Sequence, residues 1–357
     1  MFLFFQKKAL GLSISDYSIE IVSLAGSMGK PELSAVKRTI LETGIIGKGK
    51  ILDKEKIKNI LINLLKSPNF ERDKTNRIVF SMPETQSFVS ILEVPLGLKA
   101  KGIVEFIKEQ INQTLPFSLE DLYVDYKIRE REIYLVASPK EVINEYLELF
   151  NECNLRSVVI ETEFESLSRA LIKNKKETAL IIDIGAEVTN FGVFDEKGLR
   201  LSISNEIAGV KFTQSLEEGL KVPKEEAERV KKECGLNPEK EEGKIFLILQ
   251  KDVQIGIIWE VRKIEEYFLK KEGKKIDRII LTGGSASLPY LKDYLTYNLE
   301  KKVEIGDIWS KIRGAKIKSE ELKEGFIFYQ ASIGAALRGL ERNPQESGIN
   351  LAKKKEL

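Results

Sequence analysis

The chain has 357 residues, which is long enough for two lobes. It contains 57 basic and 55 acidic residues, and the resulting net charge of +2 gives no bulk electrostatic reason to bind nucleic acid. It contains no histidine, which excludes His-dependent triads and removes the commonest general base and zinc ligand. Its two cysteines, Cys153 and Cys234, lack metal-ligand spacing, so we expect a reducing compartment and no disulfide framework.

The N-terminus reads MFLFFQKKA, with lysines after a very short apolar run. This is neither the length nor the order of a secretory signal, and no other stretch is long enough to span a bilayer. Phe2, Phe4 and Phe5, followed by Lys7 and Lys8, leave a contact with a membrane surface open. The simpler interpretation is a lead-in to the first strand.

Two segments share a strand, tight turn, strand pattern: residues 9–26 (ALGLSISDYSIEIVSLAG) and residues 178–198 (TALIIDIGAEVTNFGVFDEKG). In both, apolar residues run into a small or acidic turn and then resume with alternation. The pattern predicts two β-hairpins, each opening a sheet, and hence a duplicated fold.

The segment between the hairpins predicts a further set of elements: a helix at 53–66, strands at 77–81 and 86–93, a helix at 101–114, strands at 121–130 and 132–137, and a helix at 139–153. The part from about residue 84 to residue 155 is predicted to form a compact inserted subdomain.

After the second hairpin the sequence predicts mainly helices: near 212–219, from 223 to 234, from 246 to 270, after Ser287, and at 326–342, with a loop at 237–244 and a strand at 278–281. Residues 344–357 are expected to form a flexible, basic tail.

Polar residues follow the strand of the second hairpin in the sequence DIGAEVTN. Asp183 ends an apolar strand, and Gly185 lies where the backbone must turn. Bare amides can approach a polyphosphate at such a turn, the Thr189 hydroxyl can donate, and Asp183 can hold a magnesium-bound water, which makes it the predicted metal ligand. The same D-x-G pattern also marks ordinary turns.

Two further groups of small residues are candidates for contact with a nucleotide. Gly283, Gly284 and Ser285 follow an apolar strand, where a glycine pair lets main chain lie flat against a purine or ribose or simply forms a turn. Gly334 begins a run of small residues that permits close helix packing, and plain packing explains that run whether or not it also contacts a nucleotide.

Together with residues 11–18, these groups follow the order typical of the actin, sugar-kinase and DnaK-type superfamily: two phosphate hairpins, an adenosine loop and paired helices between lobes. The expected fold is therefore a two-lobed α/β actin-like ATPase fold, with ribonuclease-H-like duplicated lobes, an inserted small α+β subdomain and ATP held between the lobes. The expected lobes are residues 1–182 with 323–343, and residues 183–322. The residues expected to bind the cofactor are Ser13, Ser15, Ser18, Asp183, Gly185, Thr189, Asn190, Gly209, Gly283, Gly284, Ser285 and Gly334.

The inserted region carries a closer resemblance. Residues 115–122 (LPFSLEDL), continuing to Asp125 and Tyr126, resemble the PilM family of actin-like proteins of type IV pilus assembly, as do residues 135–142 (LVASPKEV) and 163–170 (EFESLSRA). The motif Glu226-Ala227-Glu228, followed by Lys231, resembles a helix shared with the cell-division protein FtsA. The resemblance extends from residue 10 to residue 340.

This resemblance implies a cytoplasmic ATP-binding scaffold, peripheral to the inner membrane through its partners, with ATP and Mg²⁺ as cofactors. The implied partners are other pilus platform proteins and the cytoplasmic tail of the membrane protein PilN, which in that family lies in a groove between the first lobe and the inserted subdomain. Self-association of the chain stays open. No nucleic acid is implied. The residues themselves support only an apolar, strand-rich subdomain able to offer such a groove.

The chain departs from the family pattern in two places. The first hairpin has Ser13-Ile14-Ser15 where the family usually carries an acidic residue, which removes an organiser of magnesium and attacking water, while the hydroxyls of Ser13, Ser15 and Ser18 can still contact phosphate. Slow or absent ATP hydrolysis follows as the prediction. The second departure is the sequence NEIAG at 205–209, where the family tends to show a basic residue and paired glycines.

Glu161 and Glu163 are the only acids in this region able to orient a water molecule. The favoured interpretation is that they are solvated ends of a strand and a helix.

The sequence Gly348-Ile349-Asn350-Leu351 in the tail resembles the Ile-Asn-Leu motif by which PilN-type tails engage the family. It predicts either that the tail occupies the partner's groove or that a short match has arisen by chance.

Other functions stay open. An FtsA-like division protein would need an amphipathic anchor, which the tail does not obviously carry. A type II secretion platform is a further alternative. A small-molecule kinase would need an aspartate base, for which the sequence offers no convincing candidate, and a chaperone would need a peptide-binding domain after the second lobe.

Overall fold

The computed structural model describes residues 7–27, 29, 31–71, 75–313 and 325–353. The chain divides into two compact units, Met1–Ala170 with Ile308–Leu357, and Leu171–Asp307. These bounds differ from the expected ones, because the first strand of the second sheet lies wholly in the second unit. Residues 308–313 belong to the first unit, where the Arg313 amide donates to the Pro31 carbonyl at 2.8 Å. The remainder of the expected junction, 314–324, lies outside the described residues.

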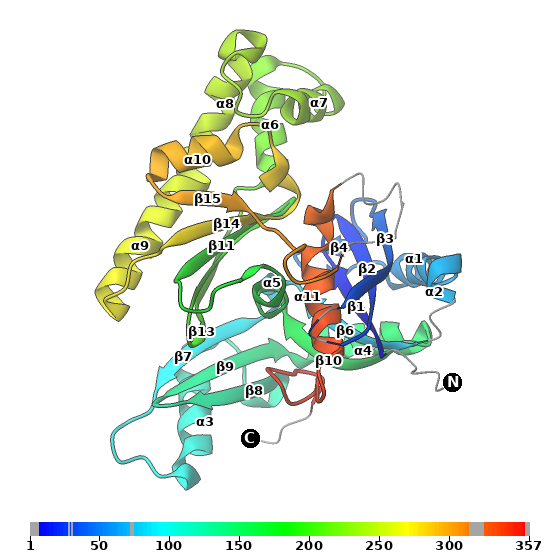
Figure 1. Cartoon of the computed structure of the whole chain (residues 1–357), viewed down its shortest axis with the longest axis vertical. Helices are drawn as coiled ribbons and strands as arrows, with labels where there is room; N and C mark the ends of the chain where they lie inside the picture. Colours follow the sequence, from blue (N-terminus) through cyan, green and yellow to red (C-terminus); the bar gives the residue numbers. More distant parts are fainter. Residues whose placement is uncertain (1–6, 28, 30, 72–74, 314–324, 354–357) are drawn as a thin grey trace. The chain divides into compact units, whose positions relative to one another are not determined.

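The first unit is built on a five-stranded sheet with the order β10-β6-β1-β2-β3 (Figure 1). Its strands are β1 (Lys8–Ile14), β2 (Ser18–Ala25), β3 (Glu32–Ile40), β6 (Arg77–Met82) and β10 (Arg156–Thr162). The pairs β1–β2 and β2–β3 are antiparallel, whereas β1–β6 and β6–β10 are parallel. A small ribbon of β4 (Ile46–Gly47) and β5 (Lys50–Ile51) follows β3.

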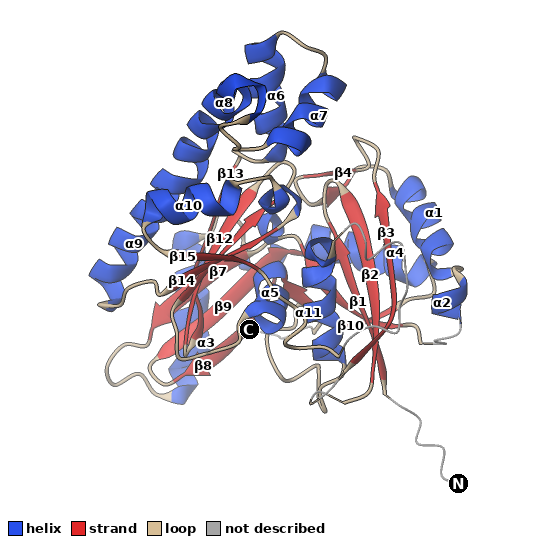
Figure 2. Cartoon of the chain, turned by 45° about the horizontal axis from the view of Figure 1, so that its top comes forward, coloured by secondary structure: helices blue, strands red, loops and turns tan. Residues whose placement is uncertain are grey.

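Helices cover both faces of this sheet: α1 (Lys54–Leu65), α2 (Pro68–Glu71), α4 (Lys140–Glu152), α5 (Glu163–Leu171) and α11 (Gln330–Gly339). Figure 2 shows α1 and α2 beside β3. On one face α11 lies so close to β1 that an ideal Cβ on Gly11 would be 1.9 Å from the Ser332 carbonyl oxygen. On the other face the Phe80 ring of β6 contacts the rings of Tyr146 at 4.7 Å and Phe150 at 5.0 Å, both from α4.

A separate three-stranded antiparallel sheet with the order β7-β9-β8 lies within the first unit. It consists of β7 (Phe88–Glu93), β8 (Leu122–Arg129) and β9 (Glu132–Pro139), covered by α3 (Ile103–Thr114). Ile107 and Ile111 of α3 pack into one apolar cluster with Leu122, Ile133 and Leu135. The expected insertion differs at its end, because α4 contributes its aromatic rings to the five-stranded sheet.

The second unit repeats the first sheet. Its order is β13-β12-β11-β14-β15, with antiparallel pairs β11–β12 and β12–β13 and parallel pairs β11–β14 and β14–β15. The strands are β11 (Ala179–Ile184), β12 (Thr189–Asp195), β13 (Gly198–Asn205), β14 (Arg278–Thr282) and β15 (Lys302–Ile305). Both predicted hairpins thus hold the same place in sheets of the same topology, and the predicted duplication is confirmed.

Five helices belong to the second unit: α6 (Gly209–Leu220), α7 (Lys224–Cys234), α8 (Lys244–Val253), α9 (Trp259–Glu272) and α10 (Leu291–Leu299). The long helix predicted over 246–270 is a continuous helical run in which α8 and α9 are joined by a π-helical turn, Gln254–Ile258. The widened turn leaves the Gly256 carbonyl to accept a hydrogen bond from Asn205 Nδ2 at 2.7 Å.

The C-terminal segment differs from the expected flexible tail. Ile349, Asn350 and Leu351 are buried in the first unit, with at most 1% of each residue exposed. Residues 354–357 lie outside the described part of the chain, as do Phe2, Phe4 and Phe5. Within the ranges described, no helix is both long and apolar enough to cross a bilayer.

Candidate functional site

Asp183 lies at the carboxyl end of β11, next to the end of the parallel strand β14. It pairs with Asn190 across the hairpin and with Thr282 of β14. Asn190 Nδ2 donates to Asp183 Oδ2 at 3.5 Å, and Ser204 Oγ donates to Asn190 Oδ1 at 2.6 Å, which turns the amide nitrogen towards the carboxylate. Ligands of open α/β sheets bind outside the carboxyl ends of parallel strands, which is the edge where Asp183 lies.

The Asp183 carboxylate is half-buried, and burial raises its pKa to about 6, although the hydrogen bond from Asn190 acts in the opposite direction. Among the described residues it has no ion-pair partner. The same residues contain no group of three or more Cys, Asp and Glu side chains that could hold a metal by themselves. A cation at Asp183 would therefore need oxygens from a ligand, as Mg²⁺ bound to one carboxylate and to phosphates does.

Gly283 brings main chain directly onto this carboxylate. Its φ is +81°, and an ideal Cβ would lie 2.3 Å from Asp183 Oδ1 and 2.6 Å from the Ile184 carbonyl oxygen. Only glycine combines this conformation with this approach. Gly284 and Ser285 follow in a short 3-10 turn, and Ser285 Oγ donates to the Gly185 carbonyl at 3.1 Å.

The turn after β11 is held against the start of α6. The Gly185 amide donates to the Val188 carbonyl at 3.0 Å, and the Gly209 amide donates to the Gly185 carbonyl at 3.2 Å. An ideal Cβ on Gly209 would lie 2.5 Å from Ser285 Oγ. Asp183, Gly185, Gly209, Gly283 and Ser285 are thus brought together, and we refer to these five residues as the strand-end cluster.

Two of the amides expected to bind phosphate, those of Gly185 and Gly209, already donate hydrogen bonds to carbonyls within this turn. The Ala186 amide, at the tip of the turn, has no acceptor in the described part of the chain. It is thus a main-chain group that remains able to bind an anion.

The Thr189 hydroxyl has a different partner from the expected one. Thr189 is fully buried, and its Oγ1 donates to the Ile207 carbonyl at 2.8 Å. The Ile207 amide in turn donates to Asn205 Oδ1 at 3.0 Å. In this structure the hydroxyl therefore fixes the segment 205–209, where the sequence departs from the family pattern, and its hydrogen is not directed at a ligand.

Lys231 supports the same region from α7, a role that the sequence did not reveal. Its Nζ donates to the Gly209 carbonyl at 2.9 Å and to Thr213 Oγ1 at 2.7 Å, and it forms an ion pair with Glu228 at 2.6 Å. Burial lowers the pKa of Lys231. The sequence offered two signals: the three-residue spacing of Glu228 and Lys231, which puts both on one face of a helix, and the resemblance of their motif to a helix of FtsA.

In the first unit, the three serines of the first hairpin are arranged around its turn. Ser13 is buried within β1. Ser15 closes the turn, because its Oγ accepts the Ser18 amide at 3.0 Å and donates to the Ser18 carbonyl at 3.1 Å. Ser18 Oγ accepts a long hydrogen bond from Arg38 Nη2 at 3.5 Å.

The acid of this turn, Asp16, is engaged by main chain. Its carboxylate accepts the amides of Lys48 at 3.0 Å and Gly49 at 2.7 Å, in the turn between β4 and β5. Asp16 therefore holds the β4–β5 ribbon against the hairpin in this structure and does not replace the acidic residue that the family usually carries.

Glu161 is neither solvated nor placed to orient water, which corrects the expectation. It is completely buried, accepts Ser166 Oγ at 2.6 Å, and forms ion pairs with Arg338 and with Arg169, whose Nη1 lies 2.7 Å from Oε1. Burial alone would raise the pKa of Glu161, but the two guanidinium groups outweigh it and hold the pKa below its usual value.

Gly334 of α11 lies beside this ion cluster. An ideal Cβ on Gly334 would be 1.9 Å from the Ser166 carbonyl oxygen, and its own carbonyl accepts Arg169 Nη1 at 2.8 Å. The close packing of α11 on α5 is thus sufficient to explain this glycine.

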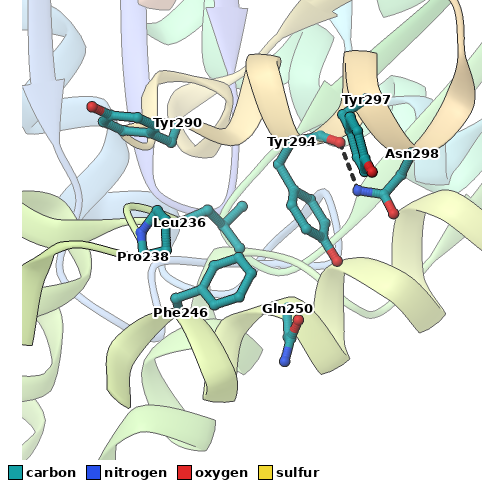
Figure 3. A pocket seen from close by; sticks show the side chains of 8 residues that line it. All are labelled: Leu236, Pro238, Phe246, Gln250, Tyr290, Tyr294, Tyr297 and Asn298. Carbon is teal, nitrogen blue, oxygen red and sulfur yellow. Dashed lines mark hydrogen bonds between the residues drawn. The ribbon is translucent and has the colours of Figure 1, made fainter. Parts of the chain in front are cut away.

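A shallow aromatic cavity of about 380 Å³ lies elsewhere in the second unit (Figure 3). It is lined by Leu236, Pro238, Phe246, Gln250, Tyr290, Tyr294, Tyr297 and Asn298. The rings of Phe246 and Tyr294 meet edge to face at 5.8 Å, and Asn298 Nδ2 donates to the Tyr294 carbonyl at 2.8 Å. None of the residues expected to bind the cofactor lines this cavity.

Comparison with known families supplies the identity that the geometry leaves open. Residues 11–340 match the family model described as type IV pilus assembly protein PilM. The chain belongs to the PilM family. The match includes most of the first hairpin, the second hairpin, the strand-end cluster and the three-stranded sheet of the first unit, and it leaves out the C-terminal segment.

Solved structures agree on the fold. A PilM–PilN type IV pilus biogenesis complex contains a chain with a TM-score of 0.78 and 21% identity, covering 93% of this chain and 98% of that one. The ethanolamine utilization protein EutJ from Carboxydothermus hydrogenoformans has a TM-score of 0.56 at 14% identity, with coverage of 92% and 89%. MreB5 of Spiroplasma citri bound to AMPPNP has a TM-score of 0.53 at 14% identity, with coverage of 92% and 97%. The actin-like fold expected from the sequence is thereby confirmed.

Proposed function

We propose that this PilM family member is an ATP-binding scaffold of the type IV pilus machinery, and that it acts at the inner face of the cytoplasmic membrane by binding the cytoplasmic tail of a PilN-like membrane protein. The observation that carries the proposal is the family match over residues 11–340. The solved PilM–PilN complex supports the choice of partner, since its PilM chain has the same fold over almost its whole length.

The strand-end cluster supports Mg²⁺ and ATP as its cofactors. Asp183 would hold a magnesium-bound water, and the Ala186 amide would donate to a phosphate oxygen. Gly283 and Gly284 would let main chain approach the nucleoside, and Asn190 keeps the Asp183 carboxylate oriented. The magnesium ion would supply charge neutralisation for the phosphates. The MreB5 structure with AMPPNP shows that a protein of this fold accepts an adenine nucleotide analogue.

Slow or absent hydrolysis is part of the proposal. Asp16 is held by the amides of Lys48 and Gly49, and Glu161 is held by two arginines, so neither acid is placed to orient an attacking water. A bound nucleotide would then act by favouring one conformation of the scaffold over another.

A binding assay tests the scaffold function. The N-terminal peptide of a PilN-like membrane protein is immobilised, and retention of the chain is measured with and without ATP and Mg²⁺, with a scrambled peptide as control. We expect retention by the native peptide only, and phosphate release far below the roughly 1 per second of ordinary enzymes. Absence of retention in every nucleotide state would refute the partner, and rapid turnover without partners would refute the scaffold.

The substitution Asp183→Asn tests the cation site through the pH dependence of the unfolding free energy. The pKa of Asp183 is raised in the folded state, so its contribution to stability is complete below about pH 4 and is lost as the pH rises to about 6. The variant should therefore be more stable than the native chain at pH 7.5, by at most about 3 kcal/mol, and nearly equal to it at pH 4. It should also lose Mg²⁺-dependent ATP binding. Denaturant titrations and calorimetry measure the two effects, and an equal stability difference at both pH values would contradict the assignment.

A further inference from the structure

The C-terminal segment lies against the exposed edge of the main sheet of the first unit. Strand β10 is the edge strand of the order β10-β6-β1-β2-β3. An edge strand presents a row of unpaired amides and carbonyls, which is a template for pairing with an added peptide. Here the Leu351 amide donates to the Ile160 carbonyl of β10 at 2.9 Å, so the segment uses that template.

Asn350 makes the remaining contacts with the edge through its side chain. Its Oδ1 accepts the Ile160 amide at 3.2 Å, and its Nδ2 donates to the Val158 carbonyl at 3.3 Å. One amide side chain therefore satisfies one donor and one acceptor of the edge strand. Aspartate in the same place would lose the donor and put an acceptor against the Val158 carbonyl, and alanine would make neither bond.

Two buried charged side chains bind the main chain of the segment. Asp125 of β8 accepts the Asn350 amide at 2.8 Å, and Arg338 of α11 donates to the Ile349 carbonyl at 2.6 Å. Both side chains are at least 98% buried. Since buried charges are costly when a hydrogen-bonding partner is removed, this groove favours being filled by extended main chain.

The segment can leave without disrupting an element of secondary structure. The last helix, α11, ends at Gly339, and residues 349–351 lie in a stretch that belongs to no helix or strand. The flanking apolar residues, Ile349 and Leu351, are almost fully enclosed, so an apolar side chain fills the groove on each side of the asparagine.

We propose that residues 349–351 are a built-in ligand of this groove, which an incoming partner segment must displace. The inference rests on the proposed function, because it takes the incoming segment to be the tail of the membrane partner. The built-in ligand would then weaken the binding of the partner to the native chain without abolishing it.

A competition experiment in the full chain tests the proposal. A fluorescent peptide SGINLAK, which copies residues 347–353, is titrated by anisotropy into the native chain, into Asn350→Ala and into Asn343→Ala. Asn343 is exposed on the same loop and serves as the matched control. A tethered ligand competes at an effective concentration on the order of millimolar. We therefore expect Asn350→Ala to bind the peptide at least about 10-fold more tightly than the native chain, Asn343→Ala to equal the native chain, and SGIDLAK to bind to none of them.

The outcomes separate this inference from the proposed function. If the folded Asn350→Ala chain binds SGINLAK no more tightly than the native chain, the built-in ligand is disproved. If it binds SGINLAK tightly but not the partner's N-terminal peptide, residues 349–351 are a displaceable ligand of the groove, and the proposed partner is wrong. If the partner peptide binds the native chain and Asn350→Ala equally, the proposed function stands and the competition fails. A chain cut after folding, at a protease site inserted at residue 345, gives the same comparison without a destabilising substitution.

Discussion

Gly283→Ala is expected to cost about 2–4 kcal/mol of unfolding free energy and to weaken ATP binding by roughly 100-fold. The added Cβ would lie 2.3 Å from Asp183 Oδ1 and 2.6 Å from the Ile184 carbonyl oxygen, and the second of these atoms is main chain that a rotamer change cannot move. Either β11 or the turn after β14 must shift, and both carry groups of the strand-end cluster. Chemical denaturation and isothermal titration with Mg²⁺ and ATP measure the two effects.

Gly273→Ala is the matched control for this substitution. Gly273 ends α9 with a φ of +68°, close to the +81° of Gly283, but nothing lies within 4 Å of its ideal Cβ. It should therefore show only the conformational cost, roughly 1 kcal/mol, with unchanged ATP affinity. If the two variants lose the same stability and Gly283→Ala still binds ATP like the native chain, the strand-end cluster is not the nucleotide site.

The duplicated sheets were predictable because their signal is local. The hairpins at residues 9–26 and 178–198 are encoded by alternation and by turn residues next to each other in the chain, and both formed as predicted. The helix ends followed similar short-range rules. Asp53, for example, caps α1 by accepting the Lys56 amide at 3.0 Å.

The boundaries of the compact units were harder to predict from the sequence, because they depend on which sheet a segment joins. A cut at residue 183 separated Asp183 from the strand that carries it, although β11 begins the second sheet as a whole. Helix α4 was placed in the inserted subdomain, yet its rings pack on Phe80 of the main sheet. Amphipathic pattern identifies the apolar face of a helix but not the surface that it covers.

The residues of the candidate site also divide into those that the local sequence reveals and those that it does not. Asp183 and Gly283 were found because each follows an apolar strand, and parallel strands bring such ends together. The partner of the Thr189 hydroxyl, the Ile207 carbonyl, could not be predicted, because the sequence does not show which acceptor a hydroxyl group meets in the folded chain. The Asn350 contacts join residues about 190 positions apart, and no local pattern encodes them.

Glu161→Gln is expected to destabilise the chain by about 3–5 kcal/mol, a large part of the stability of an ordinary domain. Glutamine nearly preserves the shape of the side chain, so packing changes little. The loss arises because Arg338, whose side chain is fully buried, and Arg169, whose side chain is 17% exposed, would keep their charges without the carboxylate that neutralises them. Denaturant unfolding of the variant and of the native chain measures the difference.

Glu233→Gln provides the comparison for an ion pair in water. Glu233 lies 2.6 Å from Arg229 on α7, but both side chains are 54% exposed, so its loss should leave the unfolding free energy almost unchanged. ATP turnover, measured at a temperature where both variants are folded, distinguishes a structural role of Glu161 from a catalytic one. A role for Glu161 in orienting water would require turnover to fall at native stability, whereas the buried ion cluster requires stability to fall at unchanged turnover. Because the carboxylate is enclosed by Ser166 and two arginines, we expect the second result.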